Sequence, residues 1–375
     1  MGSSPTDALL ALRRELDEID GRLVATLAAR QRVIDRVALA KESGGPLRDR
    51  GRERSLLNRL LSLGEAEGVE PFVIERIYRE LIDHSVRRQQ VLLAGDSHTS
   101  RCVAYQGGEG AFSHSAARRH FAAFGGETEY RGFRAFRPML ESVQDGDCEY
   151  AVLPIENTIA GSINESYDLL DDFHLFIVGE EAQPVVHHLI GLPGASVESL
   201  TRVYSHPVAL LQCRRFLGTL TSSAEAFEDT ALAVAKVKAE ADPAQAAIAS
   251  EDAANVHDLP ILVRGVQDEE ANLTRMVVVA RQPRAVDPRV PCKTSVVFST
   301  QHRRGALARS IALLAEHEIN LTKLESRPLP RSPFEYRFYL DFEGNPADLR
   351  VQRALDALAL ETSMMRVLGT YPAKI

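Results

Sequence analysis

The chain has 375 residues, enough for two to four domains, and its 45% hydrophobic and 26% charged content is ordinary for a globular protein. A net charge of −8 argues against the broad basic field that recruits nucleic acid or anionic membranes. No apolar run approaches transmembrane length, and the first residues lack the apolar core of a secretion signal, so we expect a cytoplasmic protein.

The cysteines lie tens of residues apart, and no two of them form a C-x-x-C pair: Cys102, Cys148, Cys213 and Cys292. This spacing argues against a metal site and against a disulfide framework. Reduced thiols are therefore the default expectation.

The N-terminal quarter of the chain has the apolar periodicity of helices. Apolar residues recur at alternating spacings of three and four from Leu9 to Val37, which predicts one helix roughly 50 Å long. Two shorter helices are expected near 52–67 and 71–90, the second with Pro71 in its first turn. Two short helices cannot cover so long an apolar face, whereas a second copy of the chain can. The pattern therefore predicts a dimer.

Several charged and polar residues lie at helical spacings in this region. Arg30 and Lys41 are three whole turns apart, about 16 Å along one face of the long helix. Arg13 is roughly 25 Å from Arg30 along the axis, so it can reach the same small ligand only from the other protomer. Ser85 and Gln89 share one face of the last helix. Taken singly, each is more simply explained as a solvated helix residue.

Taken together, these residues resemble the all-helical chorismate mutase family over about residues 5–92. The resemblance implies an intertwined homodimer in which Arg13 comes from the partner chain. Arginines would hold the carboxylates of chorismate, and Lys41 and Gln89 would donate to the ether oxygen as negative charge develops there. Glu53 and Ser85 would hold the ring hydroxyl, and no metal or cofactor is expected. The implied substrate-binding set is Arg13, Arg30, Lys41, Asp49, Arg52, Glu53, Ser85 and Gln89.

From Arg101 onward the pattern changes to short strands alternating with helices, and a second lobe is expected to begin near Phe176. The glycine-rich turn 106–113 suggests backbone amides that face an anion, although it lacks the dinucleotide-binding spacing. The apolar run 277–280 predicts a fully buried strand, with the polar sequence Asn-Leu-Thr-Arg of 272–275 at its mouth. Strand capping is the ordinary interpretation of such polar groups.

Four motifs in this segment resemble the prephenate dehydratase family in order and spacing, over residues 101–283: 110–113, 154–163, 204–213 and 272–275. The resemblance implies two α/β lobes, like a periplasmic binding protein, with the substrate in the cleft between them. Thr274 would protonate or hydrogen bond to the departing ring hydroxyl while the carboxylate leaves as CO2. Arg275 would anchor a carboxylate of prephenate. The other expected contacts are Asn157, Ser205, Gln212 and Thr230.

Three further residues of this segment bear on these assignments. Met276 stands where the family usually has phenylalanine, which removes a rigid aromatic wall beside Thr274. His187 and His188 are adjacent in an expected strand, so they point to opposite faces and do not form a chelating pair. His206 precedes a proline, and its role is left open between structure and site.

The last segment follows a proline-containing linker at 284–292. Strands are expected at 294–299, 319–326, 336–342 and 365–370, with helices at 305–317 and 346–358, which is the ferredoxin-like βαββαβ order. Two motifs, 305–308 and 325–328, resemble those of the regulatory ACT domain. The resemblance implies that L-phenylalanine binds between paired domains through Gly305, Ala306, Leu307, Glu325, Ser326 and Arg327.

These resemblances predict three domains, at 1–95, 101–283 and 293–375. They imply an enzyme of L-phenylalanine biosynthesis that rearranges chorismate to prephenate and converts prephenate to phenylpyruvate. Feedback inhibition by L-phenylalanine is expected at the last domain. Two alternatives remain open: a regulatory protein whose central cleft binds its ligand without turnover, and a dehydratase that prefers arogenate.

Overall fold

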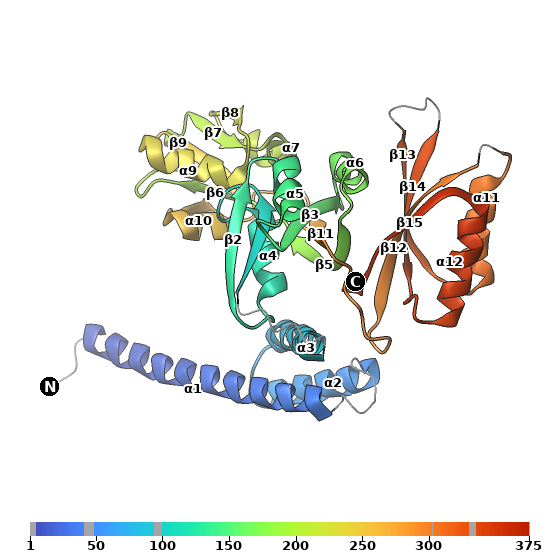
Figure 1. Cartoon of the computed structure of the whole chain (residues 1–375). Coiled ribbons are helices and arrows are strands. Elements are labelled where there is room, and N and C mark those ends of the chain that lie inside the picture. Colours follow the sequence, from blue (N-terminus) through green and yellow to red (C-terminus); the bar gives the residue numbers. More distant parts are fainter. Residues whose placement is uncertain (1–4, 41–48, 94–99, 302, 330–334, 375) are drawn as a thin grey trace. The chain divides into compact units, whose positions relative to one another are not determined.

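The computed structural model describes residues 5–40, 49–93, 100–301, 303–329 and 335–374. The chain divides into two compact units, residues 1–97 and residues 98–375 (Figure 1). Among the described helices, none combines the length and the low charge content that a bilayer span requires.

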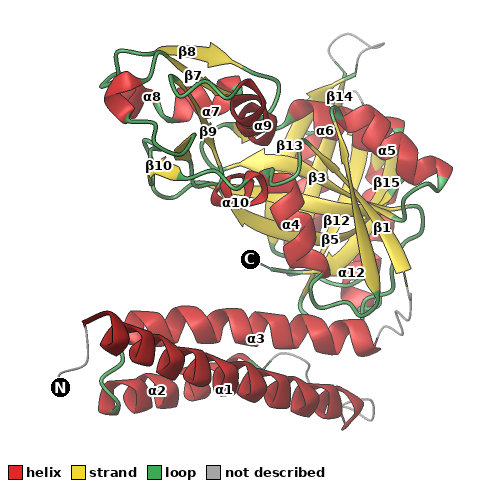
Figure 2. Ribbon diagram, turned by 90° about the vertical axis from the view of Figure 1, so that its left-hand side faces the viewer, coloured by secondary structure: helices red, strands yellow, loops and turns green. Residues whose placement is uncertain are grey.

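The elements described in the first unit are helices, joined between α2 and α3 by a short loop (Figure 2). It contains α1 (Pro5–Ala40), α2 (Arg50–Ala66) and α3 (Pro71–Leu93), which confirms the three predicted helices. α3 packs against both α1 and α2. Arg88 of α3 forms an ion pair with Asp35 of α1, with 2.9 Å between Nε and Oδ1. α2 begins where the Asp49 carboxylate accepts a hydrogen bond from the Arg52 backbone N–H at 2.9 Å, an N-cap.

The second unit begins with a mixed sheet in the order β2-β1-β3-β11-β5, and the short β4 pairs with β3. β11 lies between β3 and β5 and runs antiparallel to both of them. Val277, Val278 and Val279 of β11 are fully buried, which confirms the predicted buried strand. The elements of this lobe are β1 Ser100–Gln106, α4 Phe112–Phe121, β2 Glu127–Phe133, α5 Phe136–Asp145, β3 Tyr150–Asn157, β4 Gly161–Ser162, α6 Asn164–Asp172, β5 Phe176–Pro184 and β11 Leu273–Ala280.

A second sheet has the order β10-β6-β9-β7-β8 and forms the other predicted lobe. The chain reaches it through residues 185–187 and returns through 264–272, and the two crossing segments lie side by side. Val266 N–H donates to His187 O, and Val185 N–H donates to Asn272 O, both at 2.9 Å. The elements are β6 His188–Gly191, η1 Val197–Ser199, β7 Arg202–Ser205, α7 Pro207–Gln212, α8 Arg214–Leu217, β8 Ser223–Ala226, α9 Thr230–Glu240, β9 Gln245–Ala249, α10 Glu251–His257 and β10 Ile261–Val263.

The C-terminal elements follow the predicted order, and their strands form an antiparallel sheet in the order β13-β14-β12-β15. They are β12 Cys292–Thr300, α11 Ala306–Glu316, β13 Leu321–Pro328, β14 Tyr336–Glu343, α12 Leu349–Glu361 and β15 Thr362–Pro372. α11 and α12 cover one face of this sheet (Figure 1). From the other face Val297, Tyr339 and Tyr371 enter the core of the first lobe.

The contact between these two sheets is close enough to require glycine at one position. A Cβ atom on Gly369 of β15 would overlap the backbone of Ile177 in β5. The segments 101–283 and 293–375, which we expected to be separate domains, therefore share a hydrophobic core within one compact unit.

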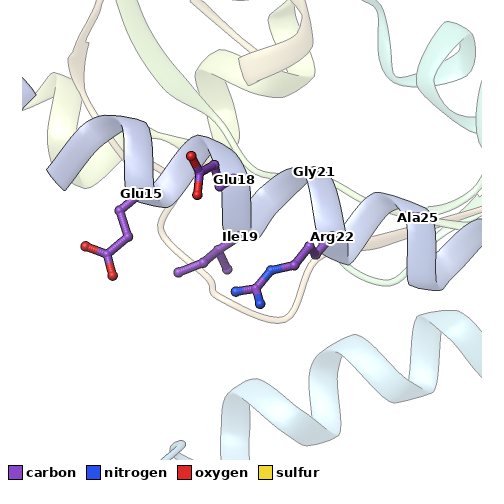
Figure 3. Close-up of a pocket in the computed structure, with 6 residues that line it drawn as sticks. All are labelled: Glu15, Glu18, Ile19, Gly21, Arg22 and Ala25. Atoms are coloured by element: carbon purple, nitrogen blue, oxygen red, sulfur yellow. The ribbon is translucent and has the colours of Figure 1, made fainter. Parts of the chain in front are cut away.

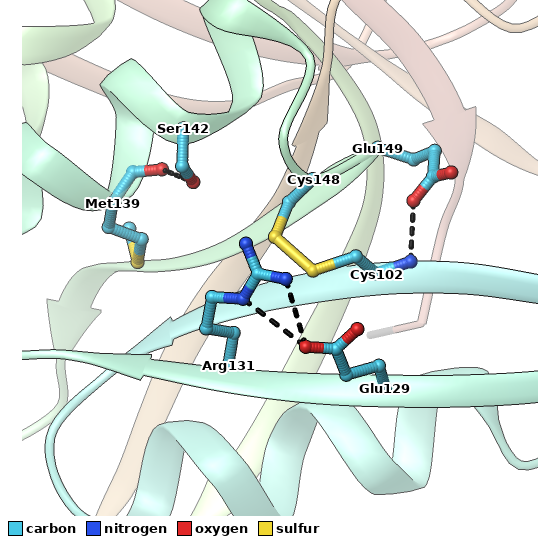
Figure 4. The surroundings of a disulfide bond; sticks show 7 residues. All are labelled: Cys102, Glu129, Arg131, Met139, Ser142, Cys148 and Glu149. Atoms are coloured by element: carbon cyan, nitrogen blue, oxygen red, sulfur yellow. Dashed lines mark hydrogen bonds and ion pairs between the residues drawn. A yellow bond between two sulfur atoms is a disulfide. The ribbon is translucent and has the colours of Figure 1, made fainter.

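Cys102 and Cys148 form a disulfide, which corrects the expectation of reduced thiols for this pair (Figure 4). The two residues are 46 positions apart in the sequence. The parallel pairing of β1 with β3 brings them together, because Glu149 N–H donates to Cys102 O at 3.0 Å immediately before β3. The spacing of the two cysteines in the sequence gives no indication of this disulfide. Cys213 and Cys292 are free and buried.

Candidate active sites

Three of the residues expected to bind chorismate converge between α1 and α3. Arg30 donates from Nη1 to the Ser85 hydroxyl at 2.7 Å and to Leu81 O at 3.3 Å. Gln89, one turn further along α3, donates to Ser85 O at 3.2 Å. The side-chain oxygen of Gln89, Oε1, is buried and has no hydrogen-bond partner among the described residues. A buried amide with an unsatisfied oxygen is the kind of group that a ligand completes.

The remaining residues of that set lie near the start of α2, on α1 or outside the described residues. Asp49 is occupied as the N-cap of α2, and Glu53 N–H donates to its carbonyl at 2.9 Å. Arg52 is exposed, whereas Glu53 is half-buried. Lys41 lies outside the described residues. Arg13 is exposed on α1 and has no hydrogen bond or ion pair with the described part of the chain.

The apolar stripe of α1 is exposed along most of its length. Its leucines and isoleucine are between 38% and 58% exposed in the single chain: Leu9, Leu12, Leu16, Ile19, Leu23 and Leu27. A shallow hollow of about 560 Å³ lies on this helix around Ile19 (Figure 3). Its lining comes from α1 alone, so it is an open surface and not an enclosed site. α2 and α3 leave the stripe uncovered, as the length argument predicted.

In the second unit, Thr274 lies at the start of β11, directly opposite Asn157 of β3. Asn157 Nδ2 donates to the Thr274 hydroxyl oxygen at 3.0 Å and to Asn272 Oδ1 at 2.7 Å. Thr274 makes no other side-chain hydrogen bond with the described residues, so its own O–H proton is free to be donated. Both Thr274 and Asn157 are 8% exposed. The structure therefore brings these two predicted site residues together.

Gln212, at the end of α7 in the other lobe, joins the same cluster. Its Oε1 accepts from Asn272 Nδ2 at 3.2 Å and from His187 Nε2 at 3.0 Å. We call Asn157, His187, Gln212, Asn272 and Thr274 the Thr274 cluster. Its members come from both lobes and from both crossing segments.

Ser205 and Thr230 are placed less directly. The Ser205 hydroxyl donates to Ile248 O at 2.6 Å and is fully buried between β7 and β9, so it serves the sheet. Thr230 opens α9 beside its N-cap, Asp229. The Asp229 carboxylate accepts from Gly108 N at 3.3 Å.

Hydrogen bonds also bear on two other expectations, which concern the glycine-rich turn 106–113 and His206. In the glycine-rich turn, Gly110 N–H donates to His114 Nδ1 at 3.0 Å, and Gly107 N–H donates to a backbone carbonyl. With Gly108 bound to Asp229, the N–H groups of all three glycines of this turn donate within the protein, so these three do not contribute to the expected anion cradle. His206 is the N-cap of α7, because its Nδ1 accepts from Val208 N, which gives it at least a structural role.

The structure corrects the expected role of Arg275. Neighbouring residues of a strand point to opposite faces, and the face of Arg275 is covered by the C-terminal sheet. Its guanidinium donates to Glu180 at 2.9 Å, to Asp341 at 2.6 Å and to the Tyr371 hydroxyl at 2.9 Å. These bonds direct Arg275 away from Thr274, so in this structure it does not anchor a ligand beside Thr274.

Met276 lies on the same face of β11 as Thr274 but deeper. It is 2% exposed and packs with Ala116, Ala117 and Phe121 of α4. The Met276 side chain fills part of a hydrophobic core and does not line an open cleft. Methionine in place of the phenylalanine usual in the family therefore changes the packing beneath Thr274.

The two expected effector motifs are not brought together within one chain. Gly305 has φ +74° and begins α11, followed by buried Ala306 and half-buried Leu307. On β13, Glu325 accepts from the Ser162 hydroxyl, and Arg327 binds both oxygens of Asp168 at 3.0 and 2.7 Å. Ser326, between them, is exposed. Glu325 and Arg327 therefore face the first α/β lobe, which contains β4 and α6.

Sequence reasoning missed three residues of the Thr274 region. Asn272 stands in a quoted motif but had no assigned role, and His187 was examined only as a metal ligand. Gln183 of β5 is paired in register with Thr274, and its buried Oε1 has no partner among the described residues. Strand register and the crossing of the two lobes place these residues, and neither can be read from local sequence.

The described chain thus has two separate polar clusters, one among helices and one where two α/β lobes meet, an arrangement that fits an enzyme with two sites. The family model described as chorismate mutase type II matches residues 12–90, and that of prephenate dehydratase matches residues 103–284. The protein from Enterobacter agglomerans named bifunctional chorismate mutase/prephenate dehydratase is 36% identical over 99% of this chain and 97% of its own length. The chain belongs to this bifunctional family.

Solved structures resemble the second unit. The prephenate dehydratase from Arthrobacter aurescens in complex with L-Phe is 26% identical, with a TM-score of 0.65 over 72% of this chain and 90% of its own. A protein described as a novel type of quorum quenching acylase is 36% identical, with a TM-score of 0.66 over 73% of this chain and 98% of its own.

Proposed function

We propose that the helical unit binds chorismate through the cluster of Arg30, Ser85 and Gln89, with Arg13 supplied by a second chain. The observation that supports it most directly is the convergence of the Arg30 guanidinium, the Ser85 hydroxyl and the Gln89 side-chain amide between α1 and α3. Chorismate is a dianion, and a guanidinium holds a carboxylate by charge-assisted hydrogen bonds. The reaction is intramolecular, so fixing the reactive conformer supplies much of the acceleration. Lys41, Arg52 and Glu53 complete the proposed set, with Asp49 holding the start of α2.

The exposed stripe of α1 supports the homodimer. Burying six large aliphatic side chains of a stripe against a second copy contributes roughly 1.5–3 kcal/mol per fully buried side chain. A partner that covers this stripe brings its own α1 alongside. Arg13 of one chain can then approach Arg30 of the other. Within a single helix these two residues are roughly 25 Å apart, too far to bind the same small ligand.

A mixing experiment tests this shared site. Arg13→Ala and Arg30→Ala homodimers are each expected to lose mutase activity. When the two variants are unfolded together and refolded, half of the dimers are mixed, and each mixed dimer has one intact site. About a quarter of wild-type activity should therefore return, measured as loss of chorismate absorbance.

The matched control mixes Arg30→Ala with Gln89→Ala. These residues lie in the same half-site, so every mixed dimer keeps two damaged sites and no activity should return. Recovery in the control, or none in the first mixture, would contradict the cross-chain site.

For the second unit we propose conversion of prephenate to phenylpyruvate in the Thr274 cluster. Thr274 donates its proton to the departing ring hydroxyl as the carboxylate leaves as CO2. A neutral alcohol is a weak general acid, so the driving force of aromatisation and exact placement of the hydroxyl must contribute. The observation that carries this proposal is the hydrogen bond that Asn157 Nδ2 donates to the Thr274 hydroxyl oxygen. Because Thr274 is the acceptor in that bond, its own proton remains available to the substrate. Arogenate stays an alternative substrate, and a direct rate comparison with prephenate decides between them.

We propose that the C-terminal sheet is an ACT domain and binds L-phenylalanine through Gly305, Ala306 and Leu307 of one chain with Glu325, Ser326 and Arg327 of a second. The relative from Arthrobacter aurescens, solved in complex with L-Phe, supports the ligand. The ion pair of Arg327 with Asp168 of α6 supports a link from this sheet to the catalytic lobe. A cytoplasmic location stays a prediction.

Phenylpyruvate formation from chorismate, with and without L-phenylalanine, tests the effector. Dehydration is expected to slow severalfold at saturating L-phenylalanine, because a coupling of about 1–3 kcal/mol is typical of allostery. D-phenylalanine is the matched control and should have little effect. An unchanged rate at millimolar concentrations of L-phenylalanine would contradict the regulatory role.

A further inference from the structure

His187 occupies the first crossing segment between the lobes and is held on several sides. Its backbone N–H donates to Gln267 Oε1 at 3.1 Å, and its carbonyl accepts from Val266 at 2.9 Å. The ring of Phe112 meets the imidazole edge-on, with 5.4 Å between centroids. The side chain is 2% exposed, and its Nε2 lies 3.0 Å from Gln212 Oε1. Neither the mutase chemistry nor the proposed general acid uses this residue.

The polarity of the hydrogen bonds in the Thr274 cluster is set by the backbone. Asn157 Oδ1 accepts from the N–H groups of Ile159 at 3.0 Å and Ala160 at 2.8 Å, so its Nδ2 must be the donor toward Asn272 Oδ1. Asn272 is thereby oriented with Nδ2 toward Gln212, and that nitrogen donates to Gln212 Oε1. Each amide in the series fixes the orientation of the next.

Gln212 is the last amide of this series, and its side-chain oxygen faces Asn272 and His187. Oε1 accepts from Asn272 Nδ2, and a rotated amide would place two donors against each other at that contact. With Oε1 fixed in this way, His187 Nε2 must carry the proton that it donates to Gln212. Gln212 is half-buried, and its Nε2 has no partner among the described residues. Its two N–H protons are therefore available to a ligand, beside the free proton of Thr274.

We infer that His187 is a positioning residue for prephenate dehydration: its Nε2–H holds the Gln212 amide with the nitrogen directed to the substrate. This inference rests on the proposed dehydratase site. The ring needs only one proton for this role, on Nε2. Burial lowers the pKa of His187, so the neutral ring is favoured at pH 7. His188, on the opposite face, accepts from Gly265 N–H at 3.1 Å and takes no part.

A double-mutant cycle in the full-length chain tests the inference. His187→Met removes the donor while keeping a side chain of similar length, and His187→Gln places an amide nitrogen near the position of Nε2. Loss of one hydrogen bond to a substrate-binding amide should raise the KM for prephenate about tenfold and leave kcat nearly unchanged. His187→Gln should stay within about threefold of wild type, because it keeps the donor.

The cycle is completed with Gln212→Met, alone and combined with His187→Met. If His187 acts through Gln212, its replacement in the Gln212→Met background should change KM less than about twofold. An equal tenfold effect in both backgrounds would show a general structural role and overturn the inference, as would a wild-type KM for His187→Met. A Gln212→Met variant with wild-type KM overturns the substrate-binding role of Gln212 as well, although turnover of prephenate by the wild-type chain would still support the proposed function.

Two further measurements keep the result interpretable. Mutase activity of each variant reports on the helical unit of the same chain, and thermal unfolding reports on the second unit. Should His187→Met not fold, His187→Asn is the second variant, because its amide is polar but too short to reach Gln212. The same tenfold rise in KM is expected of it, and a wild-type KM would overturn the inference.

Discussion

Replacing Thr274 with alanine is expected to lower dehydration of prephenate by about 10²–10⁴-fold, the usual contribution of a positioned proton donor. The hydroxyl is the group whose proton is left free by the Asn157 bond. Local structure should survive, because Asn157 Nδ2 keeps Asn272 Oδ1 at 2.7 Å and Leu273 O at 3.2 Å as acceptors. Phenylpyruvate formation from prephenate measures the loss.

Thr274→Ser is the matched control, because serine restores the hydroxyl and removes only a methyl group. It should retain most of the dehydratase activity, and both variants should convert chorismate to prephenate at the wild-type rate. The general-acid role would be wrong if the alanine variant kept a rate close to that of the serine variant.

Replacing Arg275 with methionine is expected to lower the free energy of unfolding of the second unit by about 3–5 kcal/mol, as removal of one partner from a buried ion pair does. Arg275 lies among Glu180, Asp341 and Tyr371, and the side chains of Glu180 and Asp341 are 0% and 10% exposed. Burial acts to lower the pKa of Arg275, but these anionic neighbours outweigh it and raise the pKa, so the guanidinium stays charged. Without it, Glu180 keeps Lys293 as an ion-pair partner at 3.1 Å, whereas Asp341 loses the ion pair that it makes with Arg275.

The control is Arg137→Met in the same unit. Arg137 pairs with Asp172 at 2.6 Å, but both side chains are more than half exposed, so the change should stay within about 1 kcal/mol. Denaturant unfolding, followed by tyrosine fluorescence, compares the two. Equal stability of the two variants would mean that the network of Arg275 does not hold the C-terminal sheet to β11.

Much of the architecture followed from local pattern. The spacing of the leucines in α1 predicted both the helix and its uncovered face, because a helical period of 3.6 specifies which side chains share a side. The βαββαβ order of the C-terminal segment was visible in the same way. The buried run of β11 was evident from four consecutive apolar residues, whatever its partners proved to be.

The candidate site was predicted in its chemistry more completely than in its placement. Asn157, Gln212 and Thr274 were named from motifs, and they do meet in one cluster. Arg275 was assigned to the same cluster because it follows Thr274 in the motif. Alternation along a strand separates the two side chains, and which face meets the ligand depends on the sheet that packs against β11.

The amino-acid order alone thus predicted the helical unit, the α/β lobes and the C-terminal element order, and family resemblance supplied the proposed residues of both sites. It could not establish contacts between residues far apart in the chain: the Cys102–Cys148 disulfide, the network of Arg275 with Asp341, and the series from His187 to Thr274. Local periodicity reports which side of an element a residue occupies. Strand register, lobe crossings and sheet packing determine what lies opposite, and they arise from burial summed over the whole fold.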